Sequence, residues 1–409
     1  MDEKREKIVS RQNPILSRVS YPPIQEIKAY ARKKEQIGLQ TIDLSQGQSN
    51  FPTPHFIRES VANALTDPEM EDLWIGYSPG LGLFQLREKI AEKVYKENNL
   101  SVDPETEILI TNGGSTAAFT AALTITSAHE QNILIAPFYF CYERILQIIG
   151  REACEFPLEL SRSQARVDFE KLERQISPKT ATLWITSPSN PTGKCFSENE
   201  LRKVVDLCIN NESYLIFDEV YSSLIYNENK HVNPATFDEE AAQHIVSIGS
   251  VSKNFAMAGW RIGWIIAPSE LITNFMKYQD NAVICAPVPS QIGALSAFTH
   301  ETQLPNYLKE YQKRRDLVQK RIDEIEEIWC PPMEGAIFSL VFFEKEKESR
   351  SLAFDLVKET GVITVPGDIF GKCANSALRI CYGSANSEQL NSAFDLIEKF
   401  IQKRRKSNK

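Results

Sequence analysis

One lysine near the middle of the chain is well placed for covalent chemistry. Lys253 follows an apolar run at residues 244–248 and stands among serine, glycine and aromatic residues, with Arg261 shortly after it. A lysine at a strand end is usually a solvated surface residue. Burial in such surroundings would instead lower its pKa and leave a neutral amine that can form an imine with an aldehyde. Ser250, Ser252 and Arg261 could then hold a phosphate, although Arg261 could also extend along the sheet into water.

An acid, a phenol and an amide follow other apolar runs. Asp218 ends the run at residues 214–217, and Tyr221 comes three residues later. A carboxylate in this position either caps a helix or binds a metal or cofactor. Tyr221 and Asn190, which lies in the turn at residues 187–193, could donate hydrogen bonds to a phenolate oxygen. Core packing of the tyrosine and an ordinary proline-containing turn are the structural alternatives.

Three more segments suit an anion or a planar ring. Gly114 and Ser115 join a strand to an alanine-rich helix, where glycine and the helix dipole favour a phosphate, although such turns are common. Tyr139 could stack on a ring or pack in the core. Arg379 lies inside the apolar run at residues 377–382, so it requires an anionic partner, either a protein carboxylate or the carboxylate of a substrate.

The elements that position these residues form an alternating pattern. Between about residues 105 and 270, short apolar runs alternate with amphipathic helices, and this pattern predicts a mostly parallel sheet covered on both faces. In such sheets, ligands bind at the carboxyl ends of the strands, where most of the residues above fall. The predicted strands are residues 107–111, 132–136, 182–186, 214–217, 244–248 and 262–266.

The flanking segments predict a second, smaller domain. A short helix is expected at residues 24–36, a long charged helix at 308–328, and strands near 336–343 and 377–382. We therefore expect three segments: an N-terminal arm and part of the small domain at 1–48, a large domain at 49–299, and the rest of the small α+β domain at 300–409.

Composition excludes several classes of function. The 409 residues carry a formal net charge of -8, which argues against nucleic acid or an anionic membrane as a partner. The eight cysteines lack CxxC spacing and the five histidines lack HxxxH or HExxH spacing, so we expect reduced thiols and no metal site. The charged N-terminus does not resemble a secretory signal, and no apolar stretch is long enough to span a membrane. We therefore expect a cytoplasmic protein.

Taken in order, these segments resemble the class I/II aminotransferases of fold-type I, which use pyridoxal 5′-phosphate (PLP). The resemblance implies an α/β fold, with a large PLP domain holding a mostly parallel seven-stranded sheet between helices and a smaller α+β domain formed by the N- and C-terminal segments. The segments that carry it are residues 46–54, 77–82, 86–87, 189–193, 218–221, 250–253, 259–263 and 378–380.

The resemblance also implies a role for each matching residue. Lys253 would form the Schiff base and shuttle the proton, Asp218 would pair with the pyridinium nitrogen, and Asn190 and Tyr221 would contact the phenolate oxygen. Tyr77 would reach the phosphate bound by a partner subunit, which implies a homodimer with shared active sites. The other implied contacts are Gly114, Ser115, Ser250 and Arg261 with the phosphate, Tyr139 with the ring, and Gly47 and Arg379 with the substrate carboxylate.

The implied reaction is ping-pong transfer of the amino group of an L-amino acid to a 2-oxo acid. Residues 280–291 offer no second arginine for a distal carboxylate, so a neutral, aromatic or cationic amino acid is favoured over aspartate. A lyase, a cyclising synthase or an O₂-dependent oxidase could use the same residues. A non-catalytic PLP-fold regulator would need a DNA-binding domain, and no helix-turn-helix of useful length precedes residue 45.

Overall fold

The structure is a computed structural model that describes residues 13–21, 23–36, 38–70 and 76–407. The charged first residues discussed above lie outside these ranges. Within them, no helix is long and apolar enough to cross a membrane. No group of three or more histidine, cysteine or acidic side chains in the same ranges is arranged to hold a metal ion. The eight cysteines are free, three of them buried and five half-buried.

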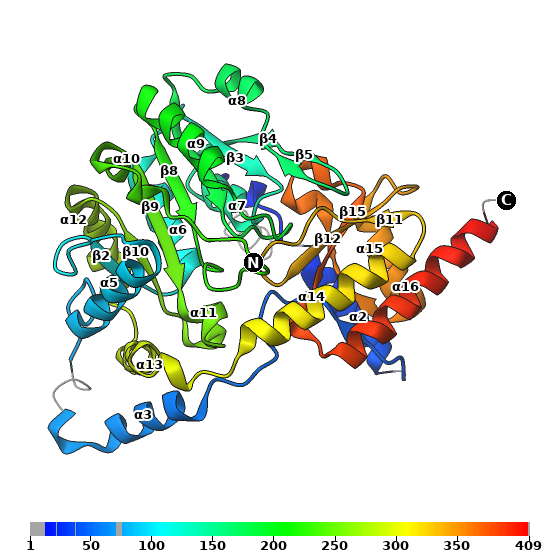
Figure 1. The fold of residues 1–409 in the computed structure, drawn as a ribbon, viewed down its shortest axis with the longest axis horizontal. Helices are drawn as coiled ribbons and strands as arrows, with labels where there is room; N and C mark the ends of the chain where they lie inside the picture. Colours follow the sequence, from blue (N-terminus) through cyan, green and yellow to red (C-terminus); the bar gives the residue numbers. More distant parts are fainter. Residues whose placement is uncertain (1–12, 22, 37, 71–75, 408–409) are drawn as a thin grey trace, which may run out of the picture.

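A seven-stranded sheet forms the centre of the larger part of the molecule (Figure 1). All of its strand pairs are parallel except the two made by β10. This confirms the predicted mostly parallel sheet. In spatial order the strands are β2 (Ile108–Thr111), β10 (Gly263–Ile266), β9 (Ile245–Ser250), β8 (Tyr214–Asp218), β7 (Thr180–Thr186), β3 (Gln131–Ala136) and β4 (Glu152–Pro157).

The six strands expected from apolar runs are all present, and β4 is the one that the apolar pattern missed. It lies at the edge of the sheet, and most of its residues are only partly buried. An edge strand with a partly solvated surface needs no continuous apolar run, so the pattern did not reveal it.

Helices cover both faces of the sheet, which explains why its inner strands are apolar throughout. On β3 and β8, Leu134 and Ile216 pack toward one set of helices, while their neighbours Ile133 and Leu215 pack toward the other. The helices of this part are α3 (His55–Thr66), α5 (Phe84–Asn98), α6 (Gly114–Ile125), α7 (Cys141–Ile148), α8 (Phe169–Gln175), α9 (Glu198–Asn210), α10 (Glu239–Gln243), α11 (Val251–Asn254), α12 (Ser269–Tyr278) and α13 (Val288–Thr299).

The two ends of the chain form a second unit together. β1 (Ile42–Asp43) pairs in parallel with β13 (Val362–Ile363), and α14 (Tyr307–Glu324) leads to this unit from the central sheet (Figure 1). The predicted strands and helices of this region are present within a few residues. The domain boundaries stay a prediction. The remaining elements are α2 (Ile24–Glu35), β11 (Ile328–Trp329), β12 (Phe338–Phe343), α15 (Ser349–Thr360), β14 (Val365–Pro366), β15 (Ala377–Cys381) and α16 (Ser387–Ser407).

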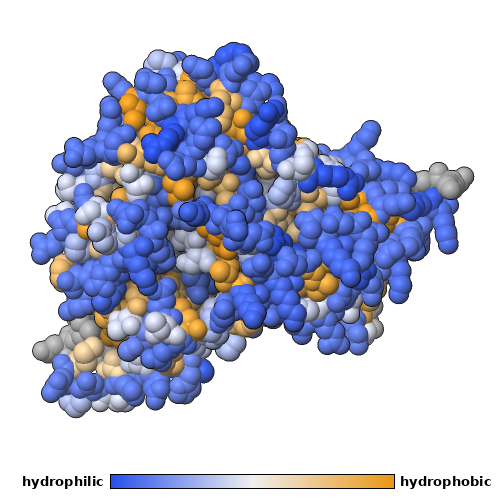
Figure 2. Space-filling view, viewed as in Figure 1, coloured by the Kyte–Doolittle hydropathy of each residue, from blue (hydrophilic) through white to orange (hydrophobic). Residues whose placement is uncertain are grey.

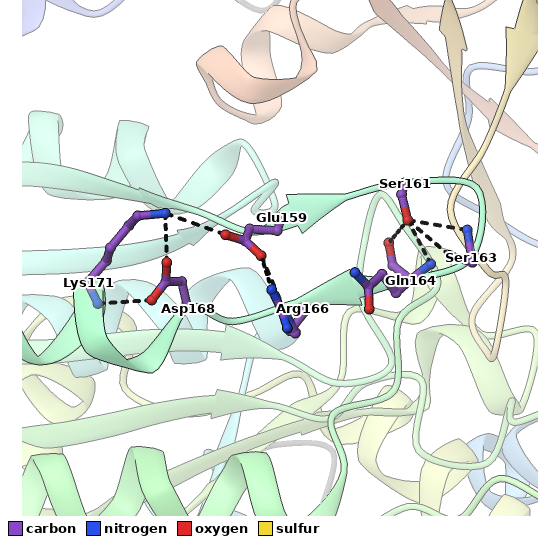
Figure 3. A network of polar contacts seen from close by, with 7 residues as sticks. All are labelled: Glu159, Ser161, Ser163, Gln164, Arg166, Asp168 and Lys171. Atoms are coloured by element: carbon purple, nitrogen blue, oxygen red, sulfur yellow. Dashed lines mark hydrogen bonds and ion pairs between the residues drawn. The ribbon is translucent and has the colours of Figure 1, made fainter.

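The surface is largely hydrophilic on the face shown in Figure 2, with apolar residues in small patches. One polar network holds a hairpin of β5 (Glu159–Leu160) and β6 (Ala165–Arg166), as Figure 3 shows. Glu159 there pairs with Arg166 at 2.5 Å and with Lys171 at 3.4 Å. Exposed ion pairs of this kind stabilise a fold by about 0–1 kcal/mol each. None of these residues lines the cavity described next, so we assign the network a local structural role.

Candidate active site

A cavity of about 570 Å³ opens where the carboxyl ends of the parallel strands meet α2 and the second unit. Five loops that follow β2, β3, β7, β8 and β9 reach it, because the ends of parallel strands share one edge of a sheet. Twelve of the thirteen predicted site residues line it. They are Gly47, Gly114, Ser115, Tyr139, Asn190, Asp218, Tyr221, Ser250, Ser252, Lys253, Arg261 and Arg379. Tyr77 lies outside this lining and is 78% exposed.

Lys253 lies in the short helix α11 and points into the cavity. The Ser250 side chain caps this helix by accepting a hydrogen bond from the backbone N–H of Ser252 at 3.1 Å. The Lys253 ammonium group donates to the carbonyl oxygen of Gly47 and lies 5.9 Å from the centre of the Tyr221 ring. Burial lowers the pKa of Lys253 to about 8. About a tenth of this amine is therefore neutral, and nucleophilic, at pH 7, far more than for an ordinary lysine.

Asp218 ends β8 as a buried carboxylate. It accepts hydrogen bonds from the Tyr142 hydroxyl and, at 3.0 Å, from the backbone N–H of Val220. Burial raises the pKa of Asp218 to about 6, and these hydrogen bonds oppose that rise. A cation placed against this carboxylate would favour its ionised form. The protonated nitrogen of a pyridine ring is such a cation.

The part of the cavity formed by Arg261 and the start of α6 suits a phosphate. Arg261 donates to the carbonyl oxygens of Ala258, at 2.9 Å, and Asn112, at 3.4 Å, and no aspartate or glutamate pairs with it in the described part of the chain. Gly113 has a φ of 86°, and a Cβ atom built there would lie 2.3 Å from an Arg261 nitrogen. Gly113 thus lets the guanidinium group approach the start of α6. No side chain caps that helix, so its N-terminal N–H groups can bind an anion.

Arg379 is a buried cation whose protein partners are neutral. It donates to Asn190 Oδ1 at 3.0 Å and to the Ser45 carbonyl oxygen at 2.6 Å. Its guanidinium carbon lies 4.5 Å from the Phe338 ring centre and 5.1 Å from that of Phe370. No carboxylate pairs with it among the residues that the structure describes. This favours the substrate's carboxylate over a protein carboxylate as its anionic partner.

Replacing Arg379 with glutamine is expected to lower kcat/KM for an amino donor by about 10²–10³-fold, mainly through KM. Losing one partner of a buried, charge-assisted pair typically costs about 2–5 kcal/mol. Steady-state kinetics would measure the effect, and the Arg379→Lys variant, which keeps the charge but not the planar donor pair, should lose less. An unchanged KM in Arg379→Gln would remove Arg379 from the carboxylate site.

Two tyrosines complete the walls. Tyr139 makes edge contacts with Phe140 and Tyr142, with ring centres 5.0 Å and 5.5 Å away. Tyr221 makes an edge contact with Phe338, with ring centres 5.6 Å apart, and burial raises its pKa well above the usual value. Its hydroxyl therefore stays protonated and can donate a hydrogen bond.

Sequence reasoning missed several residues that line the cavity. The Tyr142 hydroxyl binds Asp218 and lies 2.9 Å from Thr186 Oγ1. The sequence held one signal for Tyr142. It follows Tyr139 by three residues near the start of a helix, where residues so spaced share a face. Lys28 and Arg32 of α2 also line the cavity. Their spacing of four residues places them on one face, but nothing local indicated what that face would contact.

The arrangement fits the chemical demands of PLP. A nucleophilic amine, a buried carboxylate for a ring nitrogen, a phenol donor and a phosphate cradle border one cavity. Lys253, Asp218 and Tyr221 would hold the ring, while Arg261 and the start of α6 would hold its phosphate. The glycine at position 113 supports this fit, because its φ of 86° is strained for other residues and a Cβ atom there would displace the Arg261 guanidinium group.

Comparisons with known proteins agree with this geometry. The family described as "Aminotransferase class I and II" matches residues 40–397. The chain is 30% identical to the aromatic-amino-acid aminotransferase 2 of Thermococcus litoralis, covering 89% of this chain and 92% of that one. It is 32% identical to the (5-formylfuran-3-yl)methyl phosphate transaminase of Methanocaldococcus jannaschii, covering 93% and 96% of the two chains. The solved aspartate aminotransferase of Thermus thermophilus with maleate superposes with a TM-score of 0.85 at 26% identity, covering 95% and 99%. The chain therefore belongs to the class I and II aminotransferases and is a transaminase, an enzyme that moves an amino group from an amino acid to a 2-oxo acid.

Proposed function

We propose that Lys253 is the residue that attaches PLP and moves the proton during transamination in this enzyme. One observation carries the proposal. A single cavity holds a lysine whose pKa is lowered to about 8, a buried aspartate, and two arginines that no carboxylate pairs with in the described part of the chain. A structural core would not gather these groups around an open space, because an unpaired buried charge such as that of Arg379 is costly.

Each side chain has a definite task in this proposal. When bound, PLP supplies an electron sink that acidifies the proton on the substrate's α-carbon. The Asp218 carboxylate keeps a proton on the ring nitrogen, and Tyr142 and the Val220 N–H hold that carboxylate in place. The Tyr221 hydroxyl donates to the phenolate oxygen. Asn190, whose Oδ1 accepts from Arg379, has its amide NH₂ left for the same oxygen.

Substrate orientation follows from Arg379. Its guanidinium group binds the α-carboxylate, and this fixes the direction of the α-C–H bond relative to Lys253. The neutral amine of Lys253 would take that proton from the α-carbon and then deliver it to the cofactor. A water molecule would supply the oxygen of the first 2-oxo acid, which leaves while the amino group stays in the site, and a second 2-oxo acid would enter the same cavity and take up that amino group by the reverse steps. One site serving both substrates in turn gives ping-pong kinetics.

We also propose a cytoplasmic homodimer with shared active sites. The exposed position of the Tyr77 side chain, outside the cavity of its own subunit, supports a role in a partner subunit's phosphate site. Gel filtration with light scattering would test the dimer. The scattered cysteines in the sequence support a reducing compartment such as the cytoplasm.

A half-reaction experiment tests transamination itself. PLP-loaded enzyme mixed with an amino donor and no acceptor should release one equivalent of 2-oxo acid per site, with a matching change in cofactor absorbance. Adding pyruvate or 2-oxoglutarate should restore the original spectrum. An oxygen electrode and an ammonia assay run alongside. Oxygen consumption or continuous ammonia release without an acceptor would point to an oxidase or a lyase and would contradict the proposal.

A further inference from the structure

One face of α2 forms a wall of the cavity that the reaction so far does not use. Ile24, Lys28 and Arg32 line the cavity, each separated from the next by four residues, so they lie one above another on the helix. The helix is fixed by its other face, where Ile27 and Ala31 are buried in the core of the second unit. The basic residues of α2 are therefore presented to the cavity by a packed element of the fold.

The charges that line the cavity do not balance. Its lining contains five cationic side chains, Lys28, Arg32, Lys253, Arg261 and Arg379, and one carboxylate, that of Asp218. Lys253, Arg261, Arg379 and Asp218 have assigned partners in the proposed reaction. Lys28 forms an ion pair with Asp43 at 3.0 Å. Arg32 is exposed and forms no ion pair within the described residues, so its charge is free to meet a further anion that enters the cavity.

Contacts link the neighbouring Lys28 to the surroundings of Arg379. Asp43, which pairs with Lys28, accepts a hydrogen bond from the Ser45 backbone N–H at 2.9 Å. The carbonyl oxygen of the same Ser45 accepts from Arg379 at 2.6 Å. Lys28 is thus linked to the α-carboxylate site through two residues. Arg32 lies one turn beyond Lys28, about 6 Å further along the helix axis.

The part of the cavity next to the N-terminal end of α2 has an apolar wall. Ile24, Phe140 and Val365 all line the cavity, and Ile24 and Phe140 both pack against the cluster that contains Val365. Such a wall suits the carbon chain of a side chain, and the basic residues further along the same face of α2 suit a charged end.

We propose that Arg32, assisted by Lys28, recognises a second anionic group at the far end of the substrate's side chain. The preferred substrates are then amino acids and 2-oxo acids that carry a carboxylate or a phosphate on the side chain. This inference rests on the proposed function, since it assumes that Arg379 binds the α-carboxylate. It also changes the expectation drawn from residues 280–291, because the cation is supplied by α2.

The test compares charged substrates with uncharged partners of similar size. In the wild type, kcat/KM for glutamate should exceed that for glutamine, and Arg32→Gln should lower this ratio by about two- to fivefold, the range expected for an exposed ion pair. Lys33→Gln is the matched control, since Lys33 lies on the same helix outside the cavity lining and should leave the ratio unchanged. Arg32→Lys should restore part of the ratio. The pair phosphoserine and serine repeats the comparison, and the pair with the larger fall identifies the preferred anion.

A binding measurement separates this inference from the proposed reaction. Calorimetry on the PLP-loaded enzyme would compare glutarate with pentanoate, which differ in the second carboxylate. A preference for glutarate that falls about two- to fivefold in Arg32→Gln, and not in Lys33→Gln, supports the inference even if no donor is turned over. If the wild type and Arg32→Gln both turn over donors with the same ratio of kcat/KM between charged and uncharged substrates, the inference is overturned. The assignment as a transaminase then still stands. A wild type without preference for the charged member of each pair would overturn the inference equally.

Discussion

Replacing Lys253 with alanine is expected to lower kcat by at least about 10⁴-fold while leaving the fold intact. The variant loses both the covalent attachment of the cofactor and the base that moves the α-proton, and proton transfer alone typically contributes about 10²–10⁴-fold. Single-turnover kinetics would measure the loss. Circular dichroism would verify folding.

Chemical rescue separates a lost amine from a damaged structure. A small amine such as methylamine should partly restore turnover of Lys253→Ala, because it can occupy the vacated space and act as a base. If Lys253→Ala lost activity only because its structure was damaged, methylamine would not restore turnover. Full turnover of Lys253→Ala without added amine would refute the assignment.

Replacing Asp218 with asparagine is expected to lower kcat by about 10³-fold without preventing attachment of the cofactor. Asparagine keeps the shape but cannot hold a proton on the ring nitrogen by its charge, so proton removal from the substrate becomes much slower. The visible spectrum reports attachment at Lys253, and stopped-flow absorbance reports proton removal. Attachment of the cofactor should be retained, whereas proton removal should become slower.

The neighbouring Glu219 provides a matched control for this variant. Its carboxylate contacts His231 at 2.7 Å and Asn233 at 3.1 Å, and it does not line the cavity. Glu219→Gln should change thermal stability more than kcat. An Asp218→Asn variant as active as the wild type, or a Glu219→Gln variant as slow as Asp218→Asn, would show that this carboxylate is not specifically required.

The parts that could be predicted from the sequence are those set by local pattern. Apolar strands such as residues 214–217 are continuous because both faces of the sheet are covered. Their carboxyl ends must meet, which brings Asp218 and the loop holding Lys253 to one edge. The family resemblance added the roles of these residues and of Arg379, and the structure places those three around one cavity.

The parts that could not be predicted depend on contacts between distant segments. Gly47 accepts from Lys253 across 206 positions of the chain, and Ser45 accepts from Arg379 across 334. Arg261 adopts a left-handed backbone conformation, with a φ of 56°, which an arginine in a sequence does not indicate, because this conformation favours glycine, asparagine and aspartate. Arg32 likewise reads as one more charge on a surface helix until the packing of α2 is known.

The most direct test of the central claim is to locate the cofactor on the protein. Purified enzyme would be incubated with PLP over a range of pH, reduced with borohydride and digested, and the modified lysine identified by mass spectrometry. We predict a single modified residue, Lys253, with an attachment rate that rises with pH around a midpoint near 8 instead of the usual 10.5, because burial favours the neutral amine. Modification spread over surface lysines, or none at all, would contradict the claim that this buried amine is the catalytic centre.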